Sequence, residues 1–115
     1  IKHAVREADF VISMLPEGKH VREAYFGMGG IIENVSAKTV LIDCSTIDVE
    51  TTIKVGKEAT DKGLLIIDAP VSGGTIGAVN STLTFMVGGN SEILKLCMPL
   101  LKAMGKKIVQ VGKLG

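Results

Sequence analysis

The sequence is poor in aromatic residues, which make up 3% of its 115 residues and include no tryptophan. Its two cysteines and two histidines are too scattered for a disulfide framework or a zinc cluster. No apolar run approaches the roughly 20 residues that cross a bilayer. The net charge of +1 provides no strong field to capture nucleic acid. We therefore expect a reducing compartment and small-molecule or protein partners, with no metal, no membrane and no nucleic acid.

Glycine, in contrast, is abundant: the chain has 14, and 46% of its residues are hydrophobic. The core must then be aliphatic, and many backbone positions can adopt dihedral angles that other residues avoid. The length fits a single domain. Because the chain begins at Ile1 without a methionine and ends shortly after Val111, we expect an interior fragment of a longer protein.

Five short apolar runs, bounded by turn-forming residues, predict buried strands. They cover residues 9–15, 39–43, 64–68, 83–87 and 108–111. Helical patterns are predicted at 18–26, 49–62 and 91–104, with a short turn at 31–35. Asp48 and either Asn90 or Ser91 are candidate helix caps, and Gly63 is a candidate helix stop. Strands that are apolar throughout must be covered on both faces, so the pattern predicts an α/β fold.

Three of the predicted strands are followed by segments that could carry chemistry. These segments are SMLP at 13–16, DCST at 43–46 and DAPVSGG at 68–74. In an open α/β sheet, ligands bind at the carboxyl ends of the strands. We therefore expect all three segments to converge on one edge of the sheet.

The third segment is the most unusual of the three. Pro70 restricts one dihedral angle, and Gly73 and Gly74 remove two side chains, so successive backbone N–H groups can point into one concavity beside the Ser72 hydroxyl. Such a nest would suit a carboxylate or a phosphate. The alternative is an ordinary glycine-rich turn between two elements.

The other two segments have equally simple alternatives. Ser45 and Thr46 are either ligand contacts or caps of the following helix. Cys44 could act as a nucleophile, but it directly follows an apolar strand and has no histidine partner, which favours a buried thiol. Residues 14–16 form either an apolar wall against a flat ring or the packing of a strand end.

Taken together and in order, five motifs resemble the β-hydroxyacid dehydrogenase family, most closely the 3-hydroxyisobutyrate dehydrogenases. The motifs are SMLP, DCSTID, DAPVSGGTIGA, LTFMVGG and AMGKKIVQVG, and the similarity runs from about Ala8 to Gly115. The resemblance implies that residues 1–115 form the second part of a Rossmann-like doubly wound, mostly parallel sheet with helices on both faces. The glycine-rich βαβ unit would precede Ile1, and an all-helical domain would follow Gly115.

The resemblance also implies an oxidoreductase that transfers hydride between a small 3-hydroxyacid and NAD or NADP, giving the semialdehyde. The first candidate substrate is 3-hydroxyisobutyrate, an intermediate of valine catabolism. Residues expected at the cofactor are Met14, Leu15, Pro16, Ser45 and Thr46, and those expected at the substrate are Ser72, Gly73 and Gly74. No catalytic residue is assigned within this chain: the lysine is expected downstream of Gly115, and Lys113 lies too early. The isolated chain is therefore expected to be inactive.

Two positions depart from the family pattern. His20 stands where relatives can carry an asparagine near the cofactor, and Ser81 stands where a second glycine of the substrate motif is usual. His20 and His3 are too isolated to indicate a metal site or a general base, and both are expected to face solvent.

The sequence alone leaves two alternative functions. A tartronate or succinic semialdehyde reductase would share the fold, and a dehydrogenase-like binding module without catalysis would share the motifs. The resemblance implies a homo-oligomer for the full-length protein, located in the cytoplasm, or in the mitochondrial matrix of a eukaryote.

Overall fold

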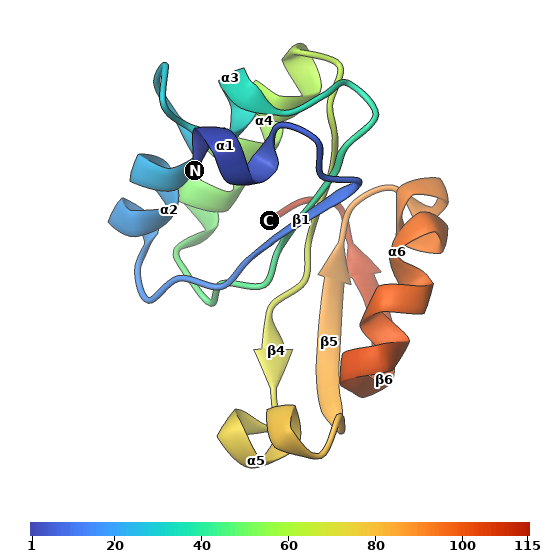
Figure 1. Ribbon diagram of the computed structural model, residues 1–115. Helices are drawn as coiled ribbons and strands as arrows, with labels where there is room; N and C mark the ends of the chain where they lie inside the picture. The colour runs from blue at the N-terminus through green and yellow to red at the C-terminus, as the bar shows by residue number, and fades with distance from the viewer.

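The computed structural model describes residues 1–115 and contains one six-stranded sheet flanked by helices (Figure 1). The strands are β1 Phe10–Ser13, β2 Val40–Asp43, β3 Leu65–Asp68, β4 Val71–Ser72, β5 Leu83–Gly88 and β6 Gly105–Gly112. The helices are α1 Lys2–Val5, α2 Gly18–Tyr25, α3 Ile31–Asn34, α4 Val49–Asp61, α5 Gly74–Val79 and α6 Ser91–Met104. No helix combines the length and hydropathy needed to cross a membrane.

The sheet runs in the order β1-β2-β3-β5-β4, and β6 also pairs with β5. The pairs β1·β2, β2·β3 and β5·β6 are parallel. The pairs β3·β5 and β4·β5 are antiparallel, and the first of them is a single contact between Asp68 and Gly88. The mostly parallel α/β sheet predicted from the sequence is therefore confirmed, with β4 as an additional strand.

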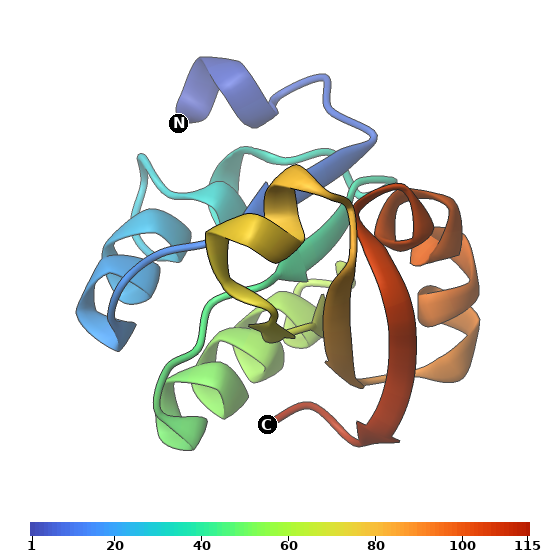
Figure 2. The same cartoon turned by 90° about the horizontal axis from the view of Figure 1, so that it is seen from below.

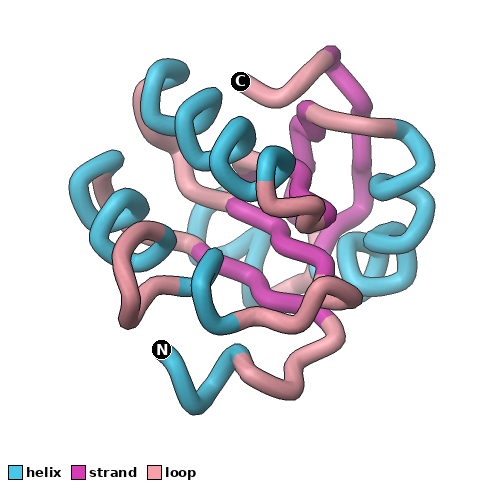
Figure 3. Tube along the Cα trace, turned by 90° about the horizontal axis from the view of Figure 1, so that it is seen from above, coloured by secondary structure: helices cyan, strands magenta, loops and turns pink.

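Two hydrophobic clusters cover the central strands from opposite sides. Helices lie on both sides of the sheet (Figure 3). On β2, Leu41 faces the cluster built with α2, α3 and α4, whereas Val40 and Ile42 face the cluster built with α6 and β5. Successive side chains of a strand point to opposite faces, so a strand that is apolar throughout feeds both clusters. All four residues of β2 are buried.

Local signals set the ends of the longer helices as predicted. The Asp48 carboxylate accepts a 2.8 Å hydrogen bond from the Thr51 N–H at the start of α4. Asn90, rather than Ser91, caps α6, because its side chain accepts from the N–H groups of Glu92 and Ile93. Gly63 follows α4 with φ +74°, in the left-handed region that glycine adopts without steric cost.

Three features of the fold differ from the prediction. The short turn predicted at 31–35 is a single helical turn over residues 31–34, and the glycine-rich segment continues into the short helix α5. The last strand is longer than predicted and is not buried on both faces: Val109 and Val111 are 37% and 66% exposed. It pairs only with β5 and so forms a boundary of the sheet, with α6 beside it (Figure 2).

Candidate functional site

The carboxyl ends of β1, β2 and β3 lie side by side. Parallel pairing aligns Ser13 with Asp43, and Asp43 with Asp68, so the three strands end in register. The three strands therefore end at one edge of the sheet, as the sequence predicted. Helix α4 begins beside this edge and supplies further polar groups.

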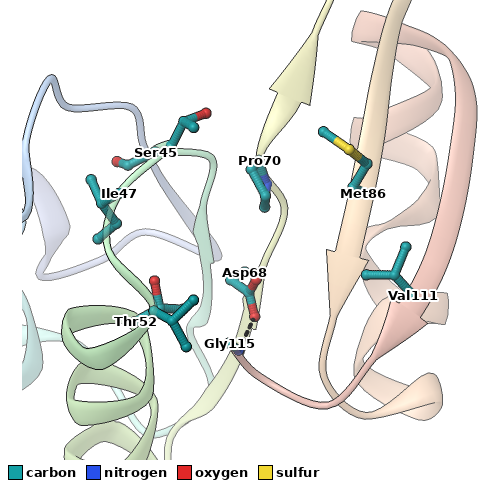
Figure 4. Close-up of a pocket in the computed structure, with 10 residues that line it drawn as sticks. Ser45, Ile47, Thr52, Asp68, Pro70, Met86, Val111 and Gly115 are labelled. Carbon is teal, nitrogen blue, oxygen red and sulfur yellow. Dashed lines mark hydrogen bonds between the residues drawn. The ribbon is translucent and has the colours of Figure 1, made fainter.

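A pocket of about 220 Å³ opens at this edge (Figure 4). On one side it is lined by the segment that follows β2, with Ser45 and Thr46, and on the other by Met86 of β5 and Val111 of β6. Asp68 and Pro70 lie between these two sides. The pocket thus combines hydroxyl groups, a carboxyl group and an apolar wall, which together suit a flat ligand with a polar edge.

Beside this pocket lies a chain of buried hydrogen bonds that we call the strand-end network, formed by Ser13, Leu15, Tyr25, Asp43 and Ser45. The Asp43 Oδ1 atom accepts from the Ser13 hydroxyl at 2.8 Å and from the Ser45 hydroxyl at 2.6 Å. Tyr25 Oη lies 2.7 Å from Ser13 Oγ, and the Leu15 N–H donates to Ser45 Oγ at 2.9 Å. The network joins the ends of β1 and β2 to the end of α2.

Asp68 is the carboxyl group exposed to the pocket. Burial raises its pKa above the ordinary value, whereas a hydrogen bond from the Gly115 N–H, at 3.1 Å, opposes that rise. The nearby Asp43 also raises the Asp68 pKa through charge repulsion. A half-buried carboxyl group with a raised pKa in a pocket is a frequent feature of functional sites.

Cys44 is a buried thiol, as predicted, with 3% of its surface exposed. Burial, followed by the charge of Asp43, raises its pKa to about 12. A thiol with such a pKa stays protonated near neutral pH, and the nucleophile is the thiolate. The alternative of a catalytic cysteine is therefore not supported.

Residues 14–16 lie outside the pocket lining. Met14 is 66% exposed and Pro16 is also exposed, whereas Leu15 is half-buried and packs against the α2–α4 cluster. They connect to the pocket through the bond from the Leu15 N–H to Ser45.

Ser72, Gly73 and Gly74 are all exposed and also lie outside the pocket lining, at the end of β4 (Figure 1). We call residues 72–74 the glycine turn. Gly73 has φ +130° and Gly74 has φ +62°, so both use backbone conformations that other residues rarely adopt. Ser81, at the other end of α5, has φ +55°, which explains why glycine suits that position.

His20 differs from the prediction. His3 is exposed, but His20 is half-buried, and its Nδ1 atom is buried without a hydrogen-bond partner. His20 lies in the first turn of α2, two residues after the buried Gly18. The expectation that both histidines face solvent is therefore wrong for His20.

Sequence reasoning missed several members of the site. Asp68 was inside a motif of interest but had no assigned role, and Met86 and Val111 come from strands whose pairing the sequence does not reveal. Tyr25 lies inside the helical pattern predicted at 18–26, which gives its hydroxyl no role. The signal that could have found the strand-end network is a polar residue ending each of two adjacent apolar strands, Ser13 and Asp43.

The fold and the pocket define a class of protein: a Rossmann-type domain with a ligand crevice at the carboxyl ends of its strands. Residues 1–112 match the family model described as the NAD binding domain of 6-phosphogluconate dehydrogenase. The chain belongs to this family of NAD-binding domains.

The chain is also similar in sequence to individual dehydrogenases. The chain is 45% identical over 111 residues to an NAD-dependent L-serine dehydrogenase of Pseudomonas aeruginosa, covering 96% of the chain and 37% of that protein. It is 49% identical over 108 residues to a 3-hydroxyisobutyrate dehydrogenase of the same organism, covering 94% of the chain and 36% of that protein. The resemblance to 3-hydroxyisobutyrate dehydrogenases inferred from the motifs is confirmed.

A solved structure supports the same relationship. The Mycobacterium tuberculosis 3-hydroxyisobutyrate dehydrogenase with L-serine superimposes with a TM-score of 0.92 at 42% identity, covering 98% of this chain and 38% of that one. The chain therefore spans little more than a third of the length of the relatives it matches.

Proposed function

We propose that the chain is part of an NAD(P)-dependent dehydrogenase that oxidises a small 3-hydroxyacid to the semialdehyde, with 3-hydroxyisobutyrate as the first candidate substrate. The observation that carries this proposal is the pocket formed where three parallel strands end together. Membership of an NAD-binding family and the names of the relatives support the choice of cofactor and substrate class.

The cofactor would lie along the ends of β1 and β2, in contact with Met14, Leu15, Pro16, Ser45 and Thr46. The pocket suits one end of a dinucleotide: Thr46 is exposed at its edge, and an apolar wall faces the hydroxyl groups. When bound, the nicotinamide supplies the hydride acceptor. The residues of this chain orient it and exclude water from one side of the ring.

The substrate carboxylate would bind at the glycine turn. Gly73 and Gly74 expose backbone N–H groups that no side chain of their own can shield, and the Ser72 hydroxyl is exposed beside them. Successive N–H groups of this kind form an anion-binding concavity. No residue of this chain is assigned to accept the hydroxyl proton.

In this proposal, residues 1–115 form part of an NAD(P)-binding Rossmann-like domain. The full-length protein supplies the glycine-rich βαβ unit, the catalytic lysine and an all-helical domain. We propose that it acts as a homo-oligomer in the cytoplasm, or in the mitochondrial matrix of a eukaryotic cell.

The test is a substrate panel on the full-length protein, with reduction of NAD⁺ or NADP⁺ followed by absorbance. The panel contains 3-hydroxyisobutyrate, L-serine and 2-(hydroxymethyl)glutarate, with tartronate and succinic semialdehydes assayed in the reverse direction. We expect 3-hydroxyisobutyrate to have the highest kcat/KM and residues 1–115 alone to show no turnover. The absence of turnover with every compound would refute the proposal.

A further inference from the structure

Asp43 is the most heavily hydrogen-bonded carboxylate of the chain. It is 4% exposed, and its Oδ1 atom accepts from the hydroxyls of Ser13 and Ser45 and from the Ser45 backbone N–H at 3.2 Å. Desolvating a carboxylate at the end of a buried strand is costly unless it is fully paired. The three donors on one oxygen provide that pairing.

The donors impose a direction on the whole network. Because Ser13 and Ser45 each have one hydroxyl proton and give it to Asp43, their oxygens act as acceptors toward their other neighbours. Ser13 Oγ then accepts from Tyr25, and Ser45 Oγ accepts from the Leu15 N–H. Every proton of the network thus points toward Asp43.

Because its single hydroxyl proton points at Asp43, Ser45 cannot donate a hydrogen bond to a ligand. Its hydroxyl proton is taken by Asp43, its oxygen already accepts from Leu15, and its surface is 5% exposed. Thr46, the next residue, makes no such side-chain hydrogen bond and is exposed at the pocket edge. The two adjacent hydroxyls therefore have different roles.

We propose that Asp43 is a positioning residue that acts through Ser45. By orienting the Ser45 hydroxyl, Asp43 holds the Leu15 backbone and so sets residues 14–16 relative to Thr46, which contacts the cofactor directly. This inference rests on the proposed function, because it assigns these two segments to one cofactor site. It changes the role of Ser45 from a ligand contact to a support of the neighbouring segment.

The experiment uses the full-length protein, with NADH as the probe and two readouts. NADH titration gives the Kd, and amide hydrogen exchange gives the protection of the Leu15 N–H. In Ser45→Ala we expect Leu15 protection to fall at least about tenfold and the Kd for NADH to rise about tenfold, which corresponds to roughly 1.4 kcal/mol. Asp43→Asn, which keeps an acceptor oxygen but loses the charge, should move both readouts in the same direction by a smaller factor.

Two further variants separate positioning from contact. Thr46→Ala should raise the Kd for NADH and leave Leu15 protection unchanged. Ser36→Ala is the matched control, because Ser36 is also a serine that accepts a backbone N–H, from Lys38, but at an exposed site away from the pocket. It should change neither readout. Melting temperatures of all four variants verify that each remains folded.

Unchanged Leu15 protection in Ser45→Ala would overturn the proposal. So would loss of that protection with an unchanged Kd, because the hydrogen bond would then have no bearing on the cofactor. A failure of the proposed function appears elsewhere, as the absence of both NADH and NADPH binding by the wild-type protein. The two failures are therefore distinguishable.

Discussion

The strand-end network and the glycine turn are built in opposite ways. The network is buried and held by side chains that converge on Asp43. The glycine turn is exposed and shaped by two consecutive positive φ angles. In the network, hydrogen bonds from side chains fix the backbone. In the glycine turn, the absence of side chains at Gly73 and Gly74 permits unusual backbone conformations. The two regions should therefore respond to different substitutions.

The largest expected effect comes from removing the central acceptor of the network. Asp43→Ala should lower the free energy of unfolding by about 3 kcal/mol, because the buried donors lose their partner. Ser72→Ala, in the glycine turn, should change it by less than about 0.5 kcal/mol. Hydrogen exchange of the β2 amides in the full-length protein measures both. Equal effects would mean that the two regions do not differ as described.

Alkaline pH should also lower the free energy of unfolding, through the buried groups near the strand-end network. The Cys44 pKa rises from 9.0 to about 12 on folding, so its stability contribution is complete below about pH 9 and falls as pH rises toward the folded value. Tyr25, whose pKa burial also raises, adds to this loss above its ordinary value of 10.0. Near pH 10.5 the Cys44 contribution should be about 2 kcal/mol smaller.

The control for the pH experiment is Cys44→Ala, which removes that group from the titration. Its unfolding free energy should decline less steeply than that of the wild type above about pH 9. Urea unfolding across the alkaline range provides the comparison. An identical slope for the two proteins would contradict the burial of a protonated thiol. Cys97, whose pKa burial raises to about 11, would retain its own smaller contribution.

A methyl group at Gly73 should destabilise the glycine turn. Gly73→Ala should cost about 1–2 kcal/mol, because φ +130° disfavours a side chain and the new Cβ would lie 3.3 Å from Leu83. In the proposed function, it should also raise KM for the hydroxyacid more than KM for NAD⁺. Steady-state kinetics of the full-length enzyme checks the second effect. A rise in KM for NAD⁺ alone would contradict the assignment of this turn to the substrate.

A milder change tests the first donor of the network. Tyr25→Phe keeps the buried ring and removes only the hydroxyl that lies against Ser13, so we expect a loss of about 1 kcal/mol. Thermal unfolding of the full-length protein provides the measurement. No loss of stability would show that the Tyr25 hydroxyl is not a working part of the network.

The smallest expected effect is a gain. Ser81→Gly should stabilise the domain by about 0.5 kcal/mol, because it relieves the cost of φ +55° at a residue with a side chain, partly offset by the greater freedom of glycine in the unfolded chain. Thermal unfolding is again sufficient. A lower melting temperature would show that the left-handed conformation costs serine little here.

The parts of the fold that could be predicted are those with local causes. Asp48 and Gly63 bound α4 because a side-chain acceptor and a left-handed glycine act on their immediate neighbours. Continuous apolar runs such as residues 40–43 predicted buried strands, because only a doubly covered strand tolerates apolar residues on both sides. The same reasoning failed for β6, where Val109 and Val111 are partly or largely exposed although the run is apolar.

The candidate site was predictable only in outline. Parallel strands end at the same edge, so the convergence of three segments followed from the strand pattern. The separation between Ser45, which is tied into the network, and Thr46, which is free at the pocket edge, depends on a contact with Leu15 that lies 30 residues away along the chain. The half-buried state of His20 and the inclusion of Met86 also depend on packing between distant segments.

The sequence by itself determined the α/β class, the capped helices, the buried thiol at Cys44 and the family resemblance, because these depend on patterns read within one segment or on motifs in order. Only the tertiary structure decided that Asp43 collects its donors from β1 and the following loop, that β5 reverses direction against β3, and that Asp68 faces the pocket. The physical reason is that hydrogen-bond direction and burial are set by which strands pair, and pairing brings together residues that no local pattern connects.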